Sequence, residues 1–563
     1  MLWRIIQTWG RPIGWGLIFL WVNNPFISAQ TSEDILGLLQ QDEEDAIHED
    51  ELVLLDDILS RTSGVNKEAL QDMLALTFLN EEDYGHIQTS LRQADFTGLI
   101  ASDEISSLLR FILHSLRNNK GIPHKVFLQQ HTSRTDGNRY RWRARMNTPI
   151  QEIGALSVRN RGSMDILDQH SFYIVRNTNN GHWIVGDHQM AFGFGLGSGK
   201  PFPPRKGWST VNKGASIYKN GLKSYKSSTG ISRTRGFAVE QSTTIGTISL
   251  SHGQTNSDIY RNNSTTQGAW QYGNKFMSVG TVFTHGIQSV FASYNRGQVR
   301  TGGEISFGSG TPSMVLGFHY GIRPFKYLVQ YRNIYAQSMG SMGNPMVEWH
   351  GSEISERGLF QGALIRVGKS RIMIYADAFH HHLRKIDGYE FGIRSETKMN
   401  RHRIVFQIKT EKKDSENESV YAPLVSPAFT NKNGIKLEHR YDARLWRTDV
   451  KYQFVRAGEI KTDHSHGLDL RLHLFRNTYK IELDWMAARV GSYDSRLYFW
   501  DVNLPGEMLT RMMARTHHSP GAKILFNLSN GSRLGFKIRA DFAHLSLRSE
   551  FGISGGIFIQ AAL

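Results

Sequence analysis

The sequence predicts a mainly β chain, in which a large antiparallel transmembrane β-barrel of about 22 strands (18–26) follows a small all-α domain. Three observations predict this class. Polar and apolar residues alternate in long runs after Gly121, the charge changes sign near residue 118, and the first thirty residues have the pattern of an export signal.

The N-terminus is predicted to be a signal peptide covering residues 1–29. Arg4 and Arg11 supply a basic start, Ile13–Val22 an apolar segment, and Ile27–Ala29 a cleavage site that ends in a small residue. An uncleaved N-terminal anchor is the alternative, although the apolar segment is short for a bilayer span.

A second region, residues 30–118, is predicted to be an acidic helical domain facing the periplasm. Residues 31–117 carry 19 acidic and 5 basic side chains, a balance of −14, whereas residues 118–563 carry a balance of +27. Apolar residues recur at helical spacing, for example at Leu70, Met73 and Leu74. Asn66, Asn80 and Ser102 are suitable N-caps for short helices.

The barrel is predicted to span residues 119–563. Leu468–Leu474 and Tyr479–Trp485 alternate apolar with charged residues and predict a hairpin. Other alternating runs are Phe325–Tyr335, Ile404–Ile408, Ile435–Tyr441, Val450–Phe454 and Ala543–Leu547, and Gly556–Leu563 is expected to close the barrel.

A soluble β-sandwich or propeller would alternate too. The runs often reach nine to twelve residues, which suits tilted membrane strands of about 9–11 residues better than soluble strands of about five or six. Charges also occupy one whole face of run after run, as a polar lumen accepts, and Tyr and Trp recur near strand ends.

One segment, Gly186–Leu196, contains Gly186, Asp187, Gln189, Phe192, Gly193 and Gly195, and Arg235-Gly236 follows downstream. Together with Asn66–Leu70 and Leu76–Leu79, it resembles a family of envelope proteins from Bacteroidetes-type bacteria. That family joins a helix-hairpin-helix region to an outer-membrane β-barrel and has no settled biochemical activity. The resemblance therefore implies an architecture more than a function.

The hairpin of the helical region departs from a DNA-binding pattern. Such hairpins present glycine-rich backbone amides to phosphate, but this turn reads Thr77-Phe78-Leu79-Asn80 and lies in a region of charge −14. Because that field repels nucleic acid, a protein contact or docking onto the barrel is the favoured role.

The sequence lacks the common sequence motifs of hydrolases and of cysteine-based sites. The chain has no cysteine, no His-Glu-x-x-His and no Gly-x-Ser-x-Gly, and we expect neither cofactor nor metal. His380–His382 are interpreted as solvated histidines of a loop or strand end, because adjacent strand residues point to opposite faces. Phe194–Pro201 superficially resembles a phosphate loop, but Phe194 and Pro201 occupy essential positions, and its glycines are expected to form a bend at the barrel wall.

Four arginines, Arg139, Arg141, Arg143 and Arg145, alternate with Tyr140, Trp142, Ala144 and Met146. We expect the arginines to face the lumen and the aromatic residues to face lipid, with Glu152 or Asp165 as possible acidic partners. Two interpretations of the basic excess stay open. Lys and Arg either contact lipopolysaccharide or solvate the rims, or they line a lumen that favours anions.

These features predict a non-enzymatic outer-membrane barrel in transport, envelope assembly or docking of a partner. Its expected partners are outer-membrane lipid, lipopolysaccharide and an unidentified periplasmic protein. A DNA-binding or DNA-uptake protein is the first alternative, and an outer-membrane hydrolase built from scattered residues is the second.

Overall fold

A computed structural model describes most residues from 124 to 562 and ten helical positions between 70 and 113. The larger gaps within the first range are 160–168, 200–206, 214–220, 226–232, 257–260, 348–354, 414–430, 459–462 and 502–509. The expected signal peptide, 1–29, and the turn Thr77–Asn80 lie outside the described residues. Among the ten helical positions, Leu70, Met73, Ile87, Leu99, Leu109 and Leu113 are buried.

Nearly all of the described chain is β-structure. The first half of the strands are β1 (His124–Ser133), β2 (Gly137–Asn147), β3 (Gln151–Arg159), β4 (Gln169–Thr178), β5 (Gly181–Ala191), β6 (Gly221–Ser224), β7 (Arg233–Thr243), β8 (Gly246–Asn256), β9 (Arg261–Gly273), β10 (Met277–Thr284), β11 (Ile287–Arg296), β12 (Val299–Phe307), β13 (Ser313–Ile322) and β14 (Phe325–Tyr335). The others are β15 (Ser355–Val367), β16 (Ser370–His381), β17 (Ile386–Met399), β18 (His402–Lys413), β19 (Asn431–Asp442), β20 (Trp446–Ala457), β21 (Asp463–Phe475), β22 (Tyr479–Arg489), β23 (Leu497–Trp500), β24 (Thr510–Met513), β25 (His517–Asn527), β26 (Arg533–Leu545) and β27 (Arg548–Ala562). Two short helical elements, α8 (Trp208–Lys213) and η2 (Ala336–Ser338), complete the described chain.

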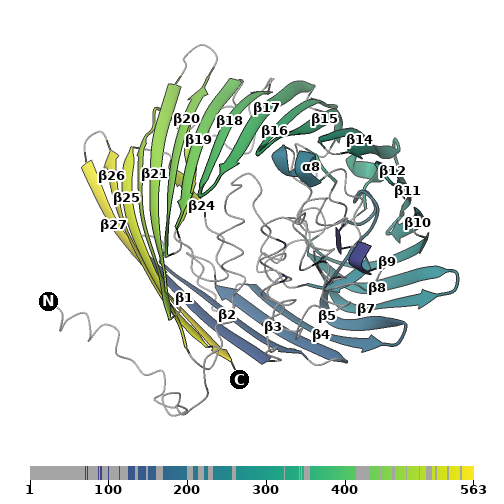
Figure 1. Ribbon diagram of the computed structural model, residues 1–563. Helices are drawn as coiled ribbons and strands as arrows, with labels where there is room; N and C mark the ends of the chain where they lie inside the picture. Colours follow the sequence, from purple (N-terminus) through teal and green to yellow (C-terminus); the bar gives the residue numbers. More distant parts are fainter. Residues whose placement is uncertain are drawn as a thin grey trace.

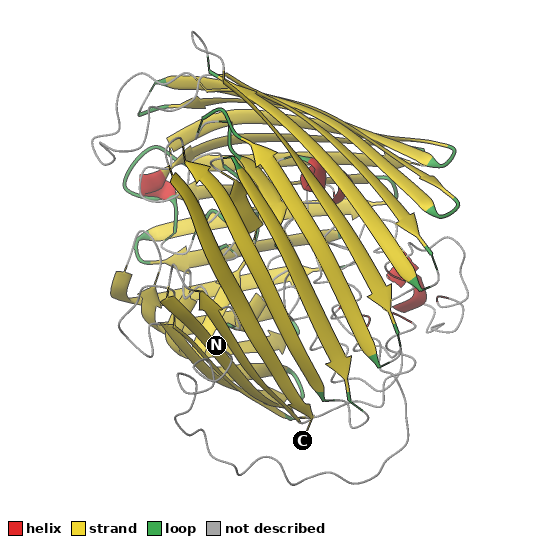
Figure 2. Cartoon of the chain, turned by 90° about the vertical axis from the view of Figure 1, so that its left-hand side faces the viewer, coloured by secondary structure: helices red, strands yellow, loops and turns green. Residues whose placement is uncertain are grey.

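The strands form a closed antiparallel barrel (Figure 1). Consecutive strands pair with each other, except that β5 pairs with both β6 and β7, β22 pairs with β25, and β23 and β24 form a separate two-stranded sheet. The last strand, β27, pairs with β1 from Lys125↔Ala562 to Ser133↔Ser554, which closes the ring. The sheet has 25 strands, and β6 pairs only with β5, so 24 strands make up the ring. Figure 2 shows that these strands run obliquely across the wall. The strand number lies within the expected range of 18–26.

Burial is inverted relative to a soluble protein. On β21 and β22, Asp469, Glu482 and Asp484 are buried, whereas Leu470, Leu483 and Trp485 are more than a third exposed. The same alternation recurs on the described strands from β10 to β26, where exposed apolar residues mark the outer face and most buried charges lie on the inner face. A soluble sandwich or propeller would bury its apolar face. That alternative is wrong.

The two ends of the barrel differ. At one end, the turn end, every connection from β2–β3 to β25–β26 is two to five residues long, and β1 begins and β27 finishes there. At the other end, the loop end, the connections include the long segments 192–232, 336–354, 414–430 and 490–516.

Aromatic side chains gather on the outer face at the turn end. Tyr272, Phe276 and Trp446 are exposed there, and Tyr441 packs against the rings of His402 (4.9 Å) and Trp446 (5.1 Å). This is the position of the aromatic belt that flanks the apolar band of a membrane barrel.

Among the described residues, the expected strands are found with one exception. The hairpin at 468–485 is β21–β22, and the last run closes the barrel within β27. Ala543–Leu547 was expected to be a strand, but β26 ends at Leu545 and β27 begins at Arg548, so this run straddles a hairpin corner. No helix among the described residues is long and apolar enough to cross a membrane.

Candidate functional site

Three long connections from the loop end fold inward and pack against the inner wall. They are the segments 192–232, 336–354 and 490–516, and the described parts of each contribute buried side chains to apolar clusters with the wall. In Figure 1, α8 of the first segment lies inside the ring of strands. These inward connections and the wall that holds them form the candidate site.

The first inward connection is held by one carboxylate. Glu304, on the inner face of β12, is buried and accepts hydrogen bonds from the backbone N–H groups of Phe194 (2.6 Å), Leu196 (3.1 Å) and Gly197 (2.9 Å). Successive backbone amides that converge in this way form an anion-binding nest. The segment that superficially resembles a phosphate loop therefore directs its backbone N–H groups at an acidic side chain of the protein itself.

Glycine makes this geometry possible. Gly193 and Gly195 have φ values of 58° and 87°, which L side chains rarely adopt, and a Cβ on Gly193 would lie 2.6 Å from Glu304 Oε2. The bend expected at the barrel wall is instead an inward fold, in which Phe192–Gly199 are all buried. The sequence pattern could not show this, because Glu304 lies 110 residues from Phe194.

The second inward connection packs on the first. The N–H of Gly340 donates to the carbonyl of Leu196 at 2.8 Å, and Met339 and Val347 share a buried cluster with Leu196. Met346 joins the cluster of Trp208 on α8, whose ring meets Tyr375 edge-on at 4.6 Å. The two connections therefore form one packed unit against the wall from β12 to β17.

The third inward connection forms a hairpin, β23–β24, on another part of the wall. Leu497, Phe499 and Met513 pack against Met486 of β22, and Gln453 Nε2 of β20 donates to the carbonyl of Tyr498 at 2.8 Å. Ion pairs join its ends to β26. Asp501 pairs with Arg539 at 2.6 Å, and Arg511 pairs with Asp541.

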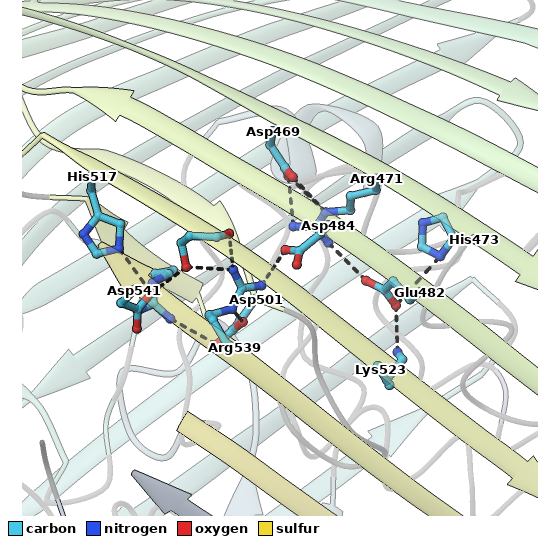
Figure 3. A network of polar contacts seen from close by, with 12 residues as sticks. Asp469, Arg471, His473, Glu482, Asp484, Asp501, His517, Lys523, Arg539 and Asp541 are labelled. Atoms are coloured by element: carbon cyan, nitrogen blue, oxygen red, sulfur yellow. Dashed lines mark hydrogen bonds and ion pairs between the residues drawn. The ribbon is translucent and has the colours of Figure 1, made fainter. Parts of the chain in front are cut away.

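Beside this hairpin lies a network of charges on β21, β22, β25 and β26 (Figure 3). Arg471 binds Asp469 at 2.9 Å and approaches Glu482 at 3.7 Å, and Lys523 binds Glu482 at 2.8 Å. Arg539 links Asp484 (2.5 Å) to Asp501. Because each charge has an opposite partner, the charges compensate one another, and removing any one of them would leave a buried charge unpaired.

A second charged cluster lies on the opposite part of the wall. The guanidinium of Arg332 binds Glu356 at 2.6 Å and both oxygens of Asp377 at 2.8 and 3.0 Å, and all three side chains have no exposed surface. A Cβ on Gly358 would lie 2.5 Å from Arg332 Cζ, so this glycine makes room for the guanidinium.

The buried inner wall is electrically balanced. Among the described residues, its ten buried acidic side chains are Glu304, Glu356, Asp377, Glu390, Glu396, Glu438, Asp449, Asp469, Glu482 and Asp484. Its ten buried basic side chains are Lys326, Arg332, Arg394, Arg403, Arg440, Lys451, Arg471, Arg533, Lys537 and Arg539. The described buried side chains therefore do not account for the excess of +27 in residues 118–563.

The arginine strand is β2. Register sets Arg141, Arg143 and Arg145 opposite Val158, Leu156 and Gly154, which lie on the face of β3 that is buried. The alternate residues Trp142 and Met146 are exposed. The side chains of Arg139, Arg141, Arg143 and Arg145 lie outside the described residues, so their lumen-facing role stays a prediction. Of the two expected acidic partners, Glu152 accepts a hydrogen bond from Tyr173 (2.7 Å), and Asp165 is not described.

The residues of the family-like motif take different positions. Asp187 and Arg235 are partners in the β5–β7 pairing and form an ion pair at 2.7 Å on the outer face. Gly186 (φ 103°) and Gly236 allow close backbone approach, because a Cβ on either would lie 2.1 Å from a neighbouring carbonyl oxygen. Gln189 lies in β5, and Phe192, Gly193 and Gly195 belong to the inward fold.

The three histidines differ in environment. His380 is exposed and bonds Asp387 at 2.8 Å, and His382 stacks on Tyr335. Burial, together with the charges of His380, His381 and Arg357, lowers the pKa of His382. His381 is fully buried, so the expectation of solvated histidines is wrong for it. No group of three or more His, Asp or Glu side chains in the described part of the chain is placed to hold a metal ion.

The inner face at the turn end carries more basic than acidic residues between β12 and β22. We call this set the basic inner rim, and it contains Arg300, Lys326, Arg366, Arg371, Lys398, Arg403, Arg440, Arg447 and Lys480. Four acidic residues lie at the same level, and each has a basic partner. Glu396 binds Arg371 and Arg403, Asp442 binds Arg447, Asp449 binds Arg440, and Glu482 binds Lys523.

No protein-family model matches the chain, and no curated protein is similar to it. Among solved structures it is similar to OccK10 (OpdN) of Pseudomonas aeruginosa, with 7% identity, 78% of this chain and 98% of that chain covered, and a TM-score of 0.31. It is also similar to the anion-selective porin from Comamonas acidovorans, with 10% identity, 56% of this chain and 93% of that chain covered, and a TM-score of 0.28. For a bacterial polysaccharide outer membrane secretin the identity is 8%, the coverage is 56% of this chain and 97% of that chain, and the TM-score is 0.23. The assignment of the fold therefore rests on the strand pairing of this chain.

Proposed function

We propose that the chain is a transport protein of the bacterial outer membrane, whose lumen is narrowed by its own inward connections. The observation that carries the proposal is the inverted burial around a closed ring. An apolar outer face more than a third exposed along strand after strand is unfavourable in water and favourable in lipid. A closed barrel also leaves no unpaired strand edge, as a bilayer requires.

The difference between the two ends supports an orientation. Outer-membrane barrels have short periplasmic turns and longer external loops. By that rule the turn end faces the periplasm, and the three inward connections enter the lumen from outside. The acidic region 30–118 precedes β1, which begins at the turn end, and this connection supports a periplasmic position for that region.

Non-enzymatic transport suits the inner wall better than catalysis does. The charged groups of the network in Figure 3 are engaged by opposite charges, and the buried carboxyl group of Glu304 is used to hold the inward fold. Glu304 and the ion pairs of Asp501 and Arg511 fix the inward connections to the wall. We infer a constriction set by polar contacts rather than a catalytic centre.

Docking of the acidic region is the second part of the proposal. The basic inner rim lies at the end where that region joins the barrel, and the region has a balance of −14. Opposite charges brought together by a covalent connection associate at high effective concentration. We propose that residues 31–117 contact this rim. In this arrangement the acidic region of the same chain, rather than DNA, is the anionic partner of the basic inner rim.

Reconstitution into liposomes tests transport. We expect the full-length protein to fractionate with the outer membrane, to migrate differently on gels before and after heating, and to pass small polar solutes slowly. A monodisperse protein purified in water without detergent would contradict the proposal. Binding of duplex DNA by the full-length protein, with a steep dependence on salt, would favour the DNA-uptake alternative instead.

A further inference from the structure

A cluster of two arginines and one aspartate lies on the outer face of β4, β5 and β7, at the loop end. Asp187 is fully buried and binds Arg235 Nε at 2.7 Å, Arg235 Nη2 at 2.9 Å and Arg233 Nη1 at 3.2 Å. The backbone carbonyl of His170 accepts from both guanidiniums, at 2.5 Å from Arg233 and 2.7 Å from Arg235. The two cations are thereby held side by side.

The cluster lies on the lipid-facing side of the wall. Register pairs Asp187 with Arg235 and, two residues along, Val185 with Phe237, so all four share one face. Phe172, Val185 and Phe237 are exposed by 47%, 40% and 51%, and they form an apolar surface just below the arginines. One strand further, His252 and Gln254 follow the apolar Leu250 on the same face. The arginines are therefore at the upper edge of the apolar band.

The cluster has one positive charge too many for a purely internal ion pair. One carboxylate neutralises one guanidinium, and Arg233 uses only its Nη1 group in the contacts that the described residues make. The side chain of Arg235 is 38% exposed and that of Arg233 is 12% exposed, and Arg235 Nη1 also lies 2.9 Å from His170 Nε2. A guanidinium beside hydrocarbon is unfavourable unless it meets water or an anion, and phosphate suits the planar donor fork of arginine.

From this geometry we infer that Asp187, Arg233 and Arg235 form a binding site for the phosphate of an outer-leaflet lipid headgroup, with the acyl chains on Phe172, Val185 and Phe237. The inference rests on the proposed membrane location. Asp187 acts as a positioning residue, because it orients both guanidiniums and does not face the phosphate. The site gives the family-like residues Asp187 and Arg235 a common role.

The test measures lipid retained by the full-length protein after purification in detergent, with diphosphoryl lipid A as the probe. Arg233→Gln removes a guanidinium and leaves the pair of Asp187 and Arg235 intact. We expect it to weaken retention about tenfold, the effect of losing one charge-assisted contact. Arg296→Gln is the matched control, because Arg296 lies on the outer face at the turn end over the ring of Phe276, and it should retain lipid as the unchanged protein does.

Three results would overturn the site. They are equal retention by Arg233→Gln, equal retention of dephosphorylated lipid A by the unchanged protein, and displacement of the lipid by millimolar inorganic phosphate, which would show a site for the free anion. Each variant is first checked for heat-modifiable migration. A protein that never inserts into membranes would contradict the proposed function. A protein that inserts normally and shows one of the three results would contradict the lipid site alone.

Discussion

At the scale of single residues, the fold depends on charges that are buried with their partners. Glu304 and Arg332 are the clearest cases, since each satisfies several groups that would otherwise be unpaired on the inner wall. Such residues are costly to remove singly, because the partner stays behind without compensation.

Glu304→Ala should release the first inward connection. It leaves three buried N–H groups without an acceptor, at a cost of about 1–3 kcal/mol each, so detachment of Phe192–Gly199 becomes favourable. We expect faster solute flux through liposomes at unchanged barrel content. Ser306→Ala is the control, because Ser306 is buried two residues along the same face of β12. Equal flux in Glu304→Ala and the unchanged protein would show that this carboxylate does not restrict the lumen.

Arg332→Leu should destabilise the barrel itself. It leaves Glu356 and Asp377 buried side by side without a cation, which costs about 3–5 kcal/mol. The temperature at which heat-modifiable migration is lost should fall, whereas Arg296→Leu on the outer face should leave it unchanged. A fall of the same size in both variants would argue against a special role of the buried triad.

At the scale of elements, the hairpin β23–β24 offers an internal comparison. Phe499 has no exposed surface, whereas its neighbour Tyr498 is exposed by 41%. Phe499→Ala creates a cavity that lowers the stability of the packed hairpin by about 3–5 kcal/mol. The hairpin should then detach from the wall, and limited proteolysis within 490–516 should become faster. Tyr498→Ala should leave the cleavage rate nearly unchanged. If both substitutions accelerate cleavage alike, the hairpin is not held through its packed face.

How much of these elements the sequence reveals depends on where their partners lie. Alternation is local, so the hairpin β21–β22 and the inner position of Asp469, Glu482 and Asp484 could be predicted from a few residues. The inward fold of Phe192–Gly199 could not, because it depends on Glu304, far along the chain. The burial of His381 likewise differs from the solvated position that the sequence around it predicts. The outer pairing of Asp187 with Arg233 and Arg235 needs the register of β5 and β7.

At the scale of the whole molecule, the chain combines an apolar exterior, a charge-balanced inner wall and connections of unequal length at its two ends. Net charge alone would have favoured an anion-selective lumen. Among the described residues the buried acids and bases are equal in number, so any anion preference would depend on the less buried basic residues of the inner face, such as the basic inner rim.

The central claim is that the strands cross a bilayer with alternate residues facing lipid. Because the chain has no cysteine, single cysteines on β13 can carry a fluorophore at one known position each. On this strand Leu316 and Phe318 are exposed, and Val315 and His319 are buried. In proteoliposomes, spin-labelled lipid should quench the label strongly at 316 and 318 and weakly at 315 and 319. Equal quenching at all four positions, or stronger quenching at 315 and 319, would contradict a membrane barrel with this orientation of its faces.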